Sequence, residues 1–285
     1  MKFRPLFLII SSLLLISSLL SIIFWGFKPS IDFIGGATWE FNLPSNPENS
    51  KIEEIFSKNN ISNLAIIKDG AKYHLSFQDI DTPQKNTLDQ AIKTLDPNYT
   101  ELKFESLGPT LGKELLQKTV AAIILSSIFL LIFIGSRFKD VTFGASAVIA
   151  MFHDTFILIG IFSILGHFFG AELDSLFVTA LLTTLSSSVH DTVVTFNRMR
   201  ELKRQNFTID WVNLANQAVT ETLSRSINNS MTIVFMLLSL VVLGGSTTKW
   251  FATALLIGVI CGTYSSTGVA IPLVLFFKKH SKKKF

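Results

Sequence analysis

Two carboxyl groups lie inside long apolar stretches of the chain, and each directly follows a histidine: Asp154 in "MFHDTF" and Asp191 in "SSSVHDTVV". Burial penalises the charged form of a carboxyl group and a nearby cation favours it, so the proton on such a group depends on its surroundings. Imidazole titrates near neutral pH and can pass a proton on. These residue types predict a site that binds and releases protons inside a membrane.

Asp191 belongs to a polar stripe on one face of its expected helix. Residues of the stripe stand three, four, seven, eight and eleven positions after Thr184, which is helical spacing. Facing lipid, the carboxylate alone would cost ~2.5–3.5 kcal/mol, so we expect the stripe to face other helices. The stripe consists of Thr184, Ser187, Ser188, Asp191, Thr192 and Thr195.

A matching stripe on a later apolar stretch offers a cation. Arg225 lies there at about the depth of Asp191, and its face also carries Thr222, Asn229 and Thr232. Two helices that run in opposite directions would bring the guanidinium and the carboxylate within pairing reach. We expect Asp191 and Arg225 to form a proton-coupling pair, with His190 and Asn229 beside them.

The remaining polar residues in apolar stretches leave two interpretations open. His153 and Asp154 are candidates for a proton relay, but a histidine here could equally well only pack, and an Asp–Arg pair could only stabilise the helix bundle. Gly258 and Gly262 form a G-x-x-x-G face, which favours close helix packing.

The apolar stretches themselves are long enough to cross a bilayer. The chain has 285 residues, 48% of them hydrophobic, and a mean hydropathy of +0.45. A helix rises ~1.5 Å per residue, so six stretches can each cross a hydrocarbon core ~30 Å thick. The first is too long for the apolar region of a cleaved signal peptide and is expected to stay as an anchor. The expected spans are Leu6–Phe27, Thr119–Ser136, Val141–Leu165, Leu173–Asn197, Ile227–Gly244 and Trp250–Phe277.

Lysine and arginine residues predict the orientation. With six spans, the N-terminus, the loop after the second span, the loop of about 198–224 and the tail 278–285 are all basic and share one side. The positive-inside rule then places both termini in the cytoplasm, so the net charge of +4 indicates topology rather than nucleic-acid binding. Cys261 is the only cysteine, which excludes a disulfide framework and a cysteine metal site. No cofactor or metal is expected.

A polar segment, residues 28–118, separates the anchor 1–27 from the five-helix domain 119–277. It carries 10 Lys and Arg against 13 Asp and Glu, so we expect a solvated domain outside the cytoplasm. Its pattern predicts strand, helix, two strands about the turn at Asp69-Gly70, a helix capped by Thr82, and a last strand. This β-α-β-β-α-β order is that of a small ferredoxin-like α+β domain. The Lys72–Asp79 strand is a candidate for binding extended polypeptide by edge addition.

The cytoplasmic loop carries "TIDWVNLANQAVTETL", residues 208–223. Val212, Ala215, Val219 and Leu223 recur at helical spacing beside Trp211. The pattern predicts an interfacial amphipathic helix and does not point to catalysis.

Several separate motifs resemble the SecD/SecF family of protein-export membrane subunits. They include "IDFIGG" with Asp32, Gly35 and Gly36, "GPTLGKEL", "SRF", "HDTVVTFNRMRE", "TLSRSINNS" and "LGGSTTKWFATALLIGVICGTYSS". The resemblance runs almost end to end and implies the resistance-nodulation-division type of membrane fold in a bacterial inner membrane. It also implies export of polypeptide driven by the proton-motive force, with SecD beside the SecYEG channel and with YajC and YidC as further partners.

By this resemblance, the family's membrane carboxylate falls on Asp191 and its arginine on Arg225. This chain departs from the family pattern at Ser186–Ser188, where Gly-Tyr-Ser is usual, at His190, where Asn is frequent, and at Asn197, where an Asp often stands. These changes keep the Asp–Arg pair and bear on proton access beside it.

Three other functions compete with protein export as explanations of these residues. An intramembrane aspartyl protease would use Asp154 and Asp191, but the sequence has no Gly-x-Gly-Asp pattern, and Arg225 would oppose the shared proton of such a dyad. A proton-driven efflux subunit of the same membrane fold usually carries two such halves in one chain. A non-conducting assembly scaffold would not need Asp191 at all. The protein is therefore expected not to be an enzyme.

Overall fold

A computed structural model describes residues 4–138 and 140–281 of the chain. The chain divides into two compact units. The membrane unit comprises residues 1–28 and 122–285, and the sheet unit comprises residues 29–121.

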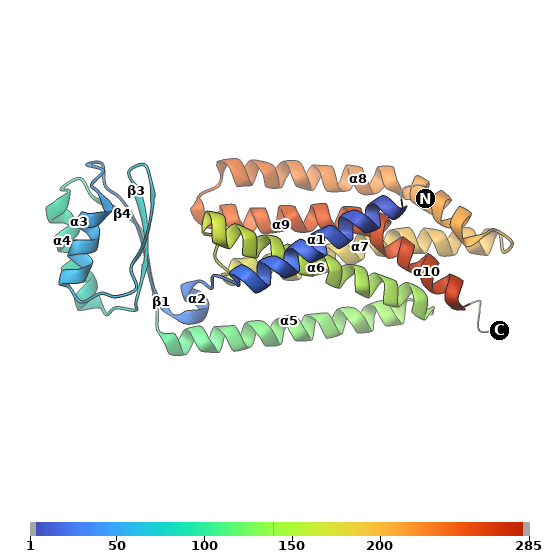
Figure 1. The fold of residues 1–285 in the computed structure, drawn as a ribbon, viewed down its shortest axis with the longest axis horizontal. Helices are drawn as coiled ribbons and strands as arrows, with labels where there is room; N and C mark the ends of the chain where they lie inside the picture. Colours follow the sequence, from blue (N-terminus) through green and yellow to red (C-terminus); the bar gives the residue numbers. More distant parts are fainter. Residues whose placement is uncertain (1–3, 139, 282–285) are drawn as a thin grey trace. The chain divides into compact units, whose positions relative to one another are not determined.

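The membrane unit is a bundle of long helices (Figure 1). Its long helices are α1 (Arg4–Trp25), α5 (Pro109–Arg137, which begins in the sheet unit), α6 (Val141–Phe169), α7 (Ser175–Gln205), α8 (Trp211–Leu243) and α9 (Ser246–Ser265). After α9 come the π-helical segment η1 (Ser266–Ala270) and α10 (Ile271–Ser281).

Five of the described helical stretches are long and apolar enough to span a membrane: α1, α5, α6, α8 and the run Thr248–His280. The expected fourth span, Leu173–Asn197, falls largely on α7. This helix has 31 residues but is less apolar than the other five. Its stripe of Ser and Thr, together with His190 and Asp191, lowers its mean hydropathy. Because the interior of a bundle can accept such a polar helix, the count of six spans stays a prediction.

α6 and α7 supply most of the buried interior, and α7 packs against α6, α8 and α9. Large fully buried side chains there include Phe143, Phe162 and Phe196. By contrast, α1, α5 and α8 expose apolar side chains, for example Phe129, which is 62% exposed. A polar helix inside and apolar helices outside is the distribution that suits a lipid surrounding.

The amphipathic helix expected at 208–223 is not a separate element. It is the first part of α8, which continues without interruption to Leu243 because no Gly or Pro lies between Trp211 and that residue. The buried face also differs from the expected one: Leu214, Ala215 and Ala218 are buried, whereas Val212 and Leu223 are about 40% exposed.

The sixth expected span is interrupted by η1, and α10 leaves this segment in a different direction from α9 (Figure 1). Pro272 lies two residues after η1 and has no N–H, so it cannot donate the hydrogen bond that a regular helix would give to Gly268. A local change from α to π geometry at this position follows from that missing donor.

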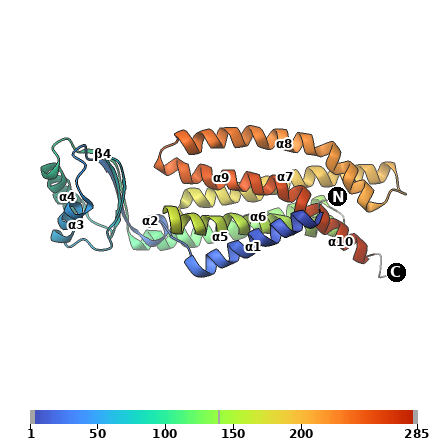
Figure 2. The ribbon, with the colours of Figure 1, turned by 45° about the horizontal axis from the view of Figure 1, so that its top comes forward.

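The sheet unit contains one antiparallel sheet with two helices on one face (Figure 2). The strands are β1 (Gly36–Asn42), β2 (Ala65–Asp69), β3 (Lys72–Phe77) and β4 (Thr100–Leu107), in the order β2-β3-β1-β4. The helices are α3 (Asn49–Lys58) and α4 (Thr82–Leu95), which pack against each other. Alternate residues of β1, Ala37, Trp39 and Phe41, are fully buried against the helical layer.

Two details of the sheet unit differ from the sequence-based expectation. Asp81, rather than Thr82, caps α4, because its carboxylate accepts from the Gln84 N–H in a capping box. The Lys72–Asp79 segment contains β3, which pairs with β1 and β2 on its two sides and therefore has no free edge. The edge strands are β2 and β4.

Two of the sequence motifs meet at the base of the sheet unit. The short helix α2 (Ile31–Ile34) is capped by Ser30 and followed by Gly35 and Gly36, both with positive φ. A Cβ at Gly35 would lie 2.6 Å from the Pro109 Cα, and one at Gly112 would lie 2.8 Å from the Gly35 backbone N. Glycine is thus required where "IDFIGG" contacts "GPTLGKEL".

Candidate functional site

A polar pocket of about 350 Å³ lies between α7, α8 and α9. Asp191 and His190 both line it; Asp191 is partly buried, whereas His190 is exposed. The other lining residues are Thr183, Ser186 and Ser187 from α7, Asn229, Ser230 and Ile233 from α8, and Val259 and Thr263 from α9. The three serines and threonines of α7, the acid and the amide give a pocket that can hold water next to a titratable group.

The Asp191 carboxylate has a neutral hydrogen-bond partner. Ser226 Oγ of α8 donates to Asp191 Oδ2 at 2.9 Å. On the α8–α9 side of the pocket, Thr263 Oγ1 donates to Ser230 Oγ at 2.7 Å. The carboxylate of Asp191 is thus held by a hydroxyl group of α8 and lines the polar pocket.

Arg225 does not face this site. Its side chain is exposed, and among the described residues it forms no ion pair with Asp191. The residues of the expected α8 stripe are likewise exposed, apart from the partly buried Thr222. The expected Asp191–Arg225 contact is therefore not formed in this structure, because the face of α8 that meets Asp191 is the one with Ser226, one residue further along the helix.

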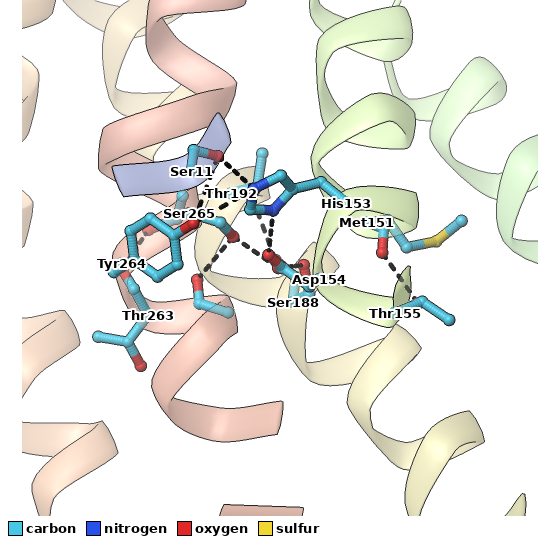
Figure 3. A network of polar contacts seen from close by, with 12 residues as sticks. Ser11, Met151, His153, Asp154, Thr155, Ser188, Thr192, Thr263, Tyr264 and Ser265 are labelled. Atoms are coloured by element: carbon cyan, nitrogen blue, oxygen red, sulfur yellow. Dashed lines mark hydrogen bonds and ion pairs between the residues drawn. The ribbon is translucent and has the colours of Figure 1, made fainter. Parts of the chain in front are cut away.

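A second polar cluster surrounds Asp154 (Figure 3). This residue is fully buried, and its Oδ2 accepts hydrogen bonds from Ser188 Oγ at 2.6 Å and Ser265 Oγ at 2.5 Å. Its Oδ1 lies 2.9 Å from His153 Nδ1. On the other side of the imidazole ring, Nε2 contacts Ser11 Oγ and lies 3.2 Å from the Tyr264 hydroxyl.

The glycine pair of α9 lies against α7 next to both clusters. A Cβ at Gly258 would lie 2.1 Å from Thr184 Oγ1, and one at Gly262 would lie 3.2 Å from the Ser188 Cα. The predicted polar stripe of α7 is thus the surface on which α9 packs. Of this stripe, Thr184, Ser188, Thr192 and Thr195 are buried, while Asp191 and Ser187 line the pocket.

Sequence reasoning missed several residues of these clusters. Ser226 had a usable signal, because it neighbours Arg225 in "TLSRSINNS", and Ser265 lies in the polar run "TYSST" of the last expected span. Ser11 and Tyr264 had none, since a serine or tyrosine in an apolar span is common in any membrane helix. Among residues 4–138 and 140–281, no group of three or more His, Cys, Asp or Glu residues is placed to hold a metal ion.

Comparison with known proteins identifies the family. Residues 87–280 match the family model of the protein-export membrane protein SecD/SecF, C-terminal part. The SecF subunit of the protein translocase from Thermobaculum terrenum is 37% identical over 93% of this chain and 89% of its own length. SecF from Synechocystis is 33% identical over 99% of this chain and 94% of its own length.

Solved structures agree with these relatives. The crystal structure of SecDF from Thermus thermophilus, described as a translocon-associated membrane protein, superposes with a TM-score of 0.87 at 27% identity. It covers 98% of this chain, which spans 39% of the length of that SecDF chain. A second SecDF structure, in a super-membrane-facing form, gives a TM-score of 0.69 at 27% identity over 99% of this chain. On sequence and fold together, this multi-pass membrane protein belongs to the SecF family of protein translocase subunits.

Proposed function

We propose that this chain works with a SecD subunit beside the SecYEG channel of a bacterial inner membrane, where it uses the proton-motive force to promote export of polypeptides. The observation that carries the proposal is the position of Asp191 in a polar pocket between three helices, with Ser226 as its hydrogen-bond donor. YajC and YidC are further partners under this proposal. The function involves no covalent chemistry on the exported chain.

The proposed topology has six spans with both termini in the cytoplasm. α7 is the least apolar of these spans, and its packing against α6, α8 and α9 supports its place in the bundle. Residues 28–118 then form the domain outside the cytoplasm, residues 119–277 the five-helix domain, and residues 278–285 the basic tail. The strand order β2-β3-β1-β4, with both helices on one face, supports a ferredoxin-like fold for the outer domain.

In the proposed mechanism, Asp191 takes up a proton in one conformation and releases it in another. A proton that crosses a potential of 100 mV gains ~2.3 kcal/mol, which shifts a conformational equilibrium by more than about tenfold. Ser226 is the hydrogen-bond donor to the Asp191 carboxylate in the conformation seen here. Arg225 is the counter-charge of another conformation, in which α8 presents its neighbouring face to α7.

Two other functions make different predictions for the same residue. A proton-driven efflux subunit would also need Asp191 but would move small molecules, and a non-conducting scaffold would not need the carboxylate. A shared-proton aspartyl dyad is disfavoured, because the two acids have separate hydrogen-bond partners: Ser188 and Ser265 for Asp154, and Ser226 for Asp191.

Export by the reconstituted complex with Asp191→Asn tests the proposal. The amide keeps the shape and the bond from Ser226 but cannot titrate, so the complex should assemble and lose its proton-dependent export. Glu201→Gln is the matched control, because Glu201 lies on the same helix with a side chain 56% exposed. Normal export by Asp191→Asn, with the normal response to an uncoupler, would reject proton coupling at this residue.

A further inference from the structure

The carboxylate of Asp154 is a fully satisfied hydrogen-bond acceptor in the interior of the bundle. It is 0% exposed and accepts from Ser188 of α7, Ser265 of α9 and its neighbour His153. Through His153, the cluster also reaches Ser11 of α1 (Figure 3). Because a buried carboxylate without partners is costly, three donors from three helices indicate that those helices are held in register around it.

Asp154 differs from Asp191 in its access to the polar pocket. Asp191 lines the polar pocket, whereas Asp154 does not and is closed off from it. Ser188 directly follows the pocket residue Ser187, and Ser265 is two residues after the pocket residue Thr263. The Asp154 cluster therefore binds α7 and α9, two of the three helices that line the Asp191 pocket, at positions next to their lining residues.

The groups that face Asp154 are few and mostly uncharged. α6 itself contributes His153, α7 contributes Ser188, and α9 contributes Ser265, with Tyr264 and Cys261 nearby. Within the described part of the chain, its only ion-pair partner is His153. Hydroxyl groups, rather than a lysine or arginine, hold this acid in place.

Two features of α9 make the contact with Ser265 a sensitive point. Gly262 lets α9 approach the Ser188 backbone, and the π-helical segment begins at the residue after Ser265. Ser265 Oγ also lies 3.3 Å from the Gly262 carbonyl oxygen, which is an alternative acceptor when the carboxylate is removed. Loss of the Asp154 contact would thus allow α7 and α9 to shift against each other. The Ser265 hydroxyl would still have the Gly262 carbonyl as its acceptor.

We propose that Asp154 is a positioning residue for Asp191: it fixes α7 against α9 and so holds the pocket in which Asp191 titrates. The inference rests on the proposed proton coupling at Asp191. It assigns to Asp154 no proton of its own during the cycle, in contrast to a relay through His153 and Asp154.

The conservative amide separates these two roles. In Asp154→Asn, the amide oxygen can accept from both serines, and the amide N–H can donate to His153 Nδ1 once the ring carries its proton on Nε2. In Asp154→Ala, both serines and the imidazole lose their acceptor. If Asp154 is a positioning residue, Asp154→Asn should keep the proton-dependent export that Asp154→Ala loses. If Asp154 itself carries a proton, both variants should lose this export.

The experiment uses the full chain in complex with its SecD partner in proteoliposomes. The probe is a hydrophobic carbodiimide, which modifies protonated carboxyl groups, and its reaction at Asp191 is followed against pH by mass spectrometry of the peptide. Proton-dependent export is measured on the same samples, and co-purification with the partner reports assembly. The variants are Asp154→Asn, Asp154→Ala and Ser265→Ala, with Ser239→Ala as matched control, because Ser239 is exposed and donates to the Phe235 carbonyl of its own helix.

For Asp154→Ala we expect a loss of export of about tenfold or more and a shifted pH midpoint of Asp191 modification. Ser265→Ala should shift the midpoint in the same direction by less, and Asp154→Asn should restore both the midpoint and export to near the control. Loss of export in Asp154→Asn with an unchanged Asp191 midpoint would overturn the proposal, as would unchanged behaviour of Asp154→Ala. If Asp154→Ala fails to assemble, Asp154→Asn and Ser265→Ala decide by the same criteria. Failure of proton coupling itself would appear separately, as normal export by Asp191→Asn.

Discussion

Ser226 Oγ donates a hydrogen bond of 2.9 Å to the Asp191 carboxylate, while Arg225, the preceding residue of α8, is exposed. Successive residues of an α-helix are about 100° apart around the axis, so the two side chains cannot face α7 at the same time. A neutral donor and a cation thus occupy adjacent faces of one helix beside a single acid. Rotation of α8 by about one residue position would exchange them.

Replacing Ser226 by Ala should disturb proton-driven export, because the Asp191 carboxylate loses its hydrogen-bond donor. A hydrogen bond to a charged group is worth about 1.5–3 kcal/mol, so its loss should change how readily the site supports export. Proton-driven export should therefore fall and its pH profile should change, as measured in proteoliposomes with a controlled internal pH. Ser239→Ala, on the exposed side of the same helix, should leave the profile in place. Identical profiles for the two variants would remove Ser226 from the mechanism.

Arg225→Met should abolish proton-dependent export although the side chain forms no ion pair with Asp191 in this structure. The reason is that the deprotonated acid would lack a counter-charge in the conformation with α8 rotated. Arg225→Lys keeps the charge and should retain part of the activity. The measurement is export with and without an uncoupler. Full activity of Arg225→Met would mean that Arg225 has no role in proton coupling.

Gly258→Ala should destabilise the membrane unit. Its Cβ would lie 2.1 Å from Thr184 Oγ1, and overpacking of this kind costs about 1–3 kcal/mol. Thermal unfolding of the purified protein in detergent should show a lower midpoint. Gly135→Ala is the control, because nothing lies within 4 Å of its added Cβ and alanine is the better helix former. Equal midpoints for the two variants would contradict the close α7–α9 contact.

The sheet unit should lose stability at acid pH through Asp96. Hydrogen bonds from the backbone N–H of Ser45 at 2.8 Å and of Asn98 at 2.9 Å hold the pKa of this carboxyl below its usual range. The contribution is therefore present above the unfolded pKa, ~3.9, and is lost as the pH falls through the lower folded value. Urea unfolding followed by the fluorescence of buried Trp39, with the Trp39→Phe signal subtracted, should show the advantage over Asp96→Ala shrinking below about pH 4. A pH-independent difference would exclude this linkage.

Single cysteines at Asp69 and Arg204 test the topology. The β2–β3 turn and the end of α7 should react with an impermeant thiol reagent from opposite sides of the membrane, because the positive-inside rule predicts that the basic loops are cytoplasmic. The native Cys261 is buried and should stay unlabelled. Reaction of both positions from one side would overturn the six-span arrangement.

The sequence by itself determined the features that depend on neighbouring residues along the chain. Apolar length predicted the membrane helices, the Asp69-Gly70 turn predicted the β2–β3 hairpin, and the cost of a carboxylate in lipid placed the stripe of Asp191 inside the bundle. The separate motifs also indicated the family, which the relatives and the SecDF structure confirm.

Only the tertiary structure decided which side chains meet. It placed Ser226 rather than Arg225 at Asp191, gave Asp154 its donors from α7 and α9, and made β3 an inner strand. The physical reason is that a contact between two helices depends on the rotation of each about its axis. That rotation is set by the packing of many residues far apart in sequence, such as Gly258 against Thr184. Helical periodicity predicts only which face of a helix is buried, not which residue of that face meets a given partner.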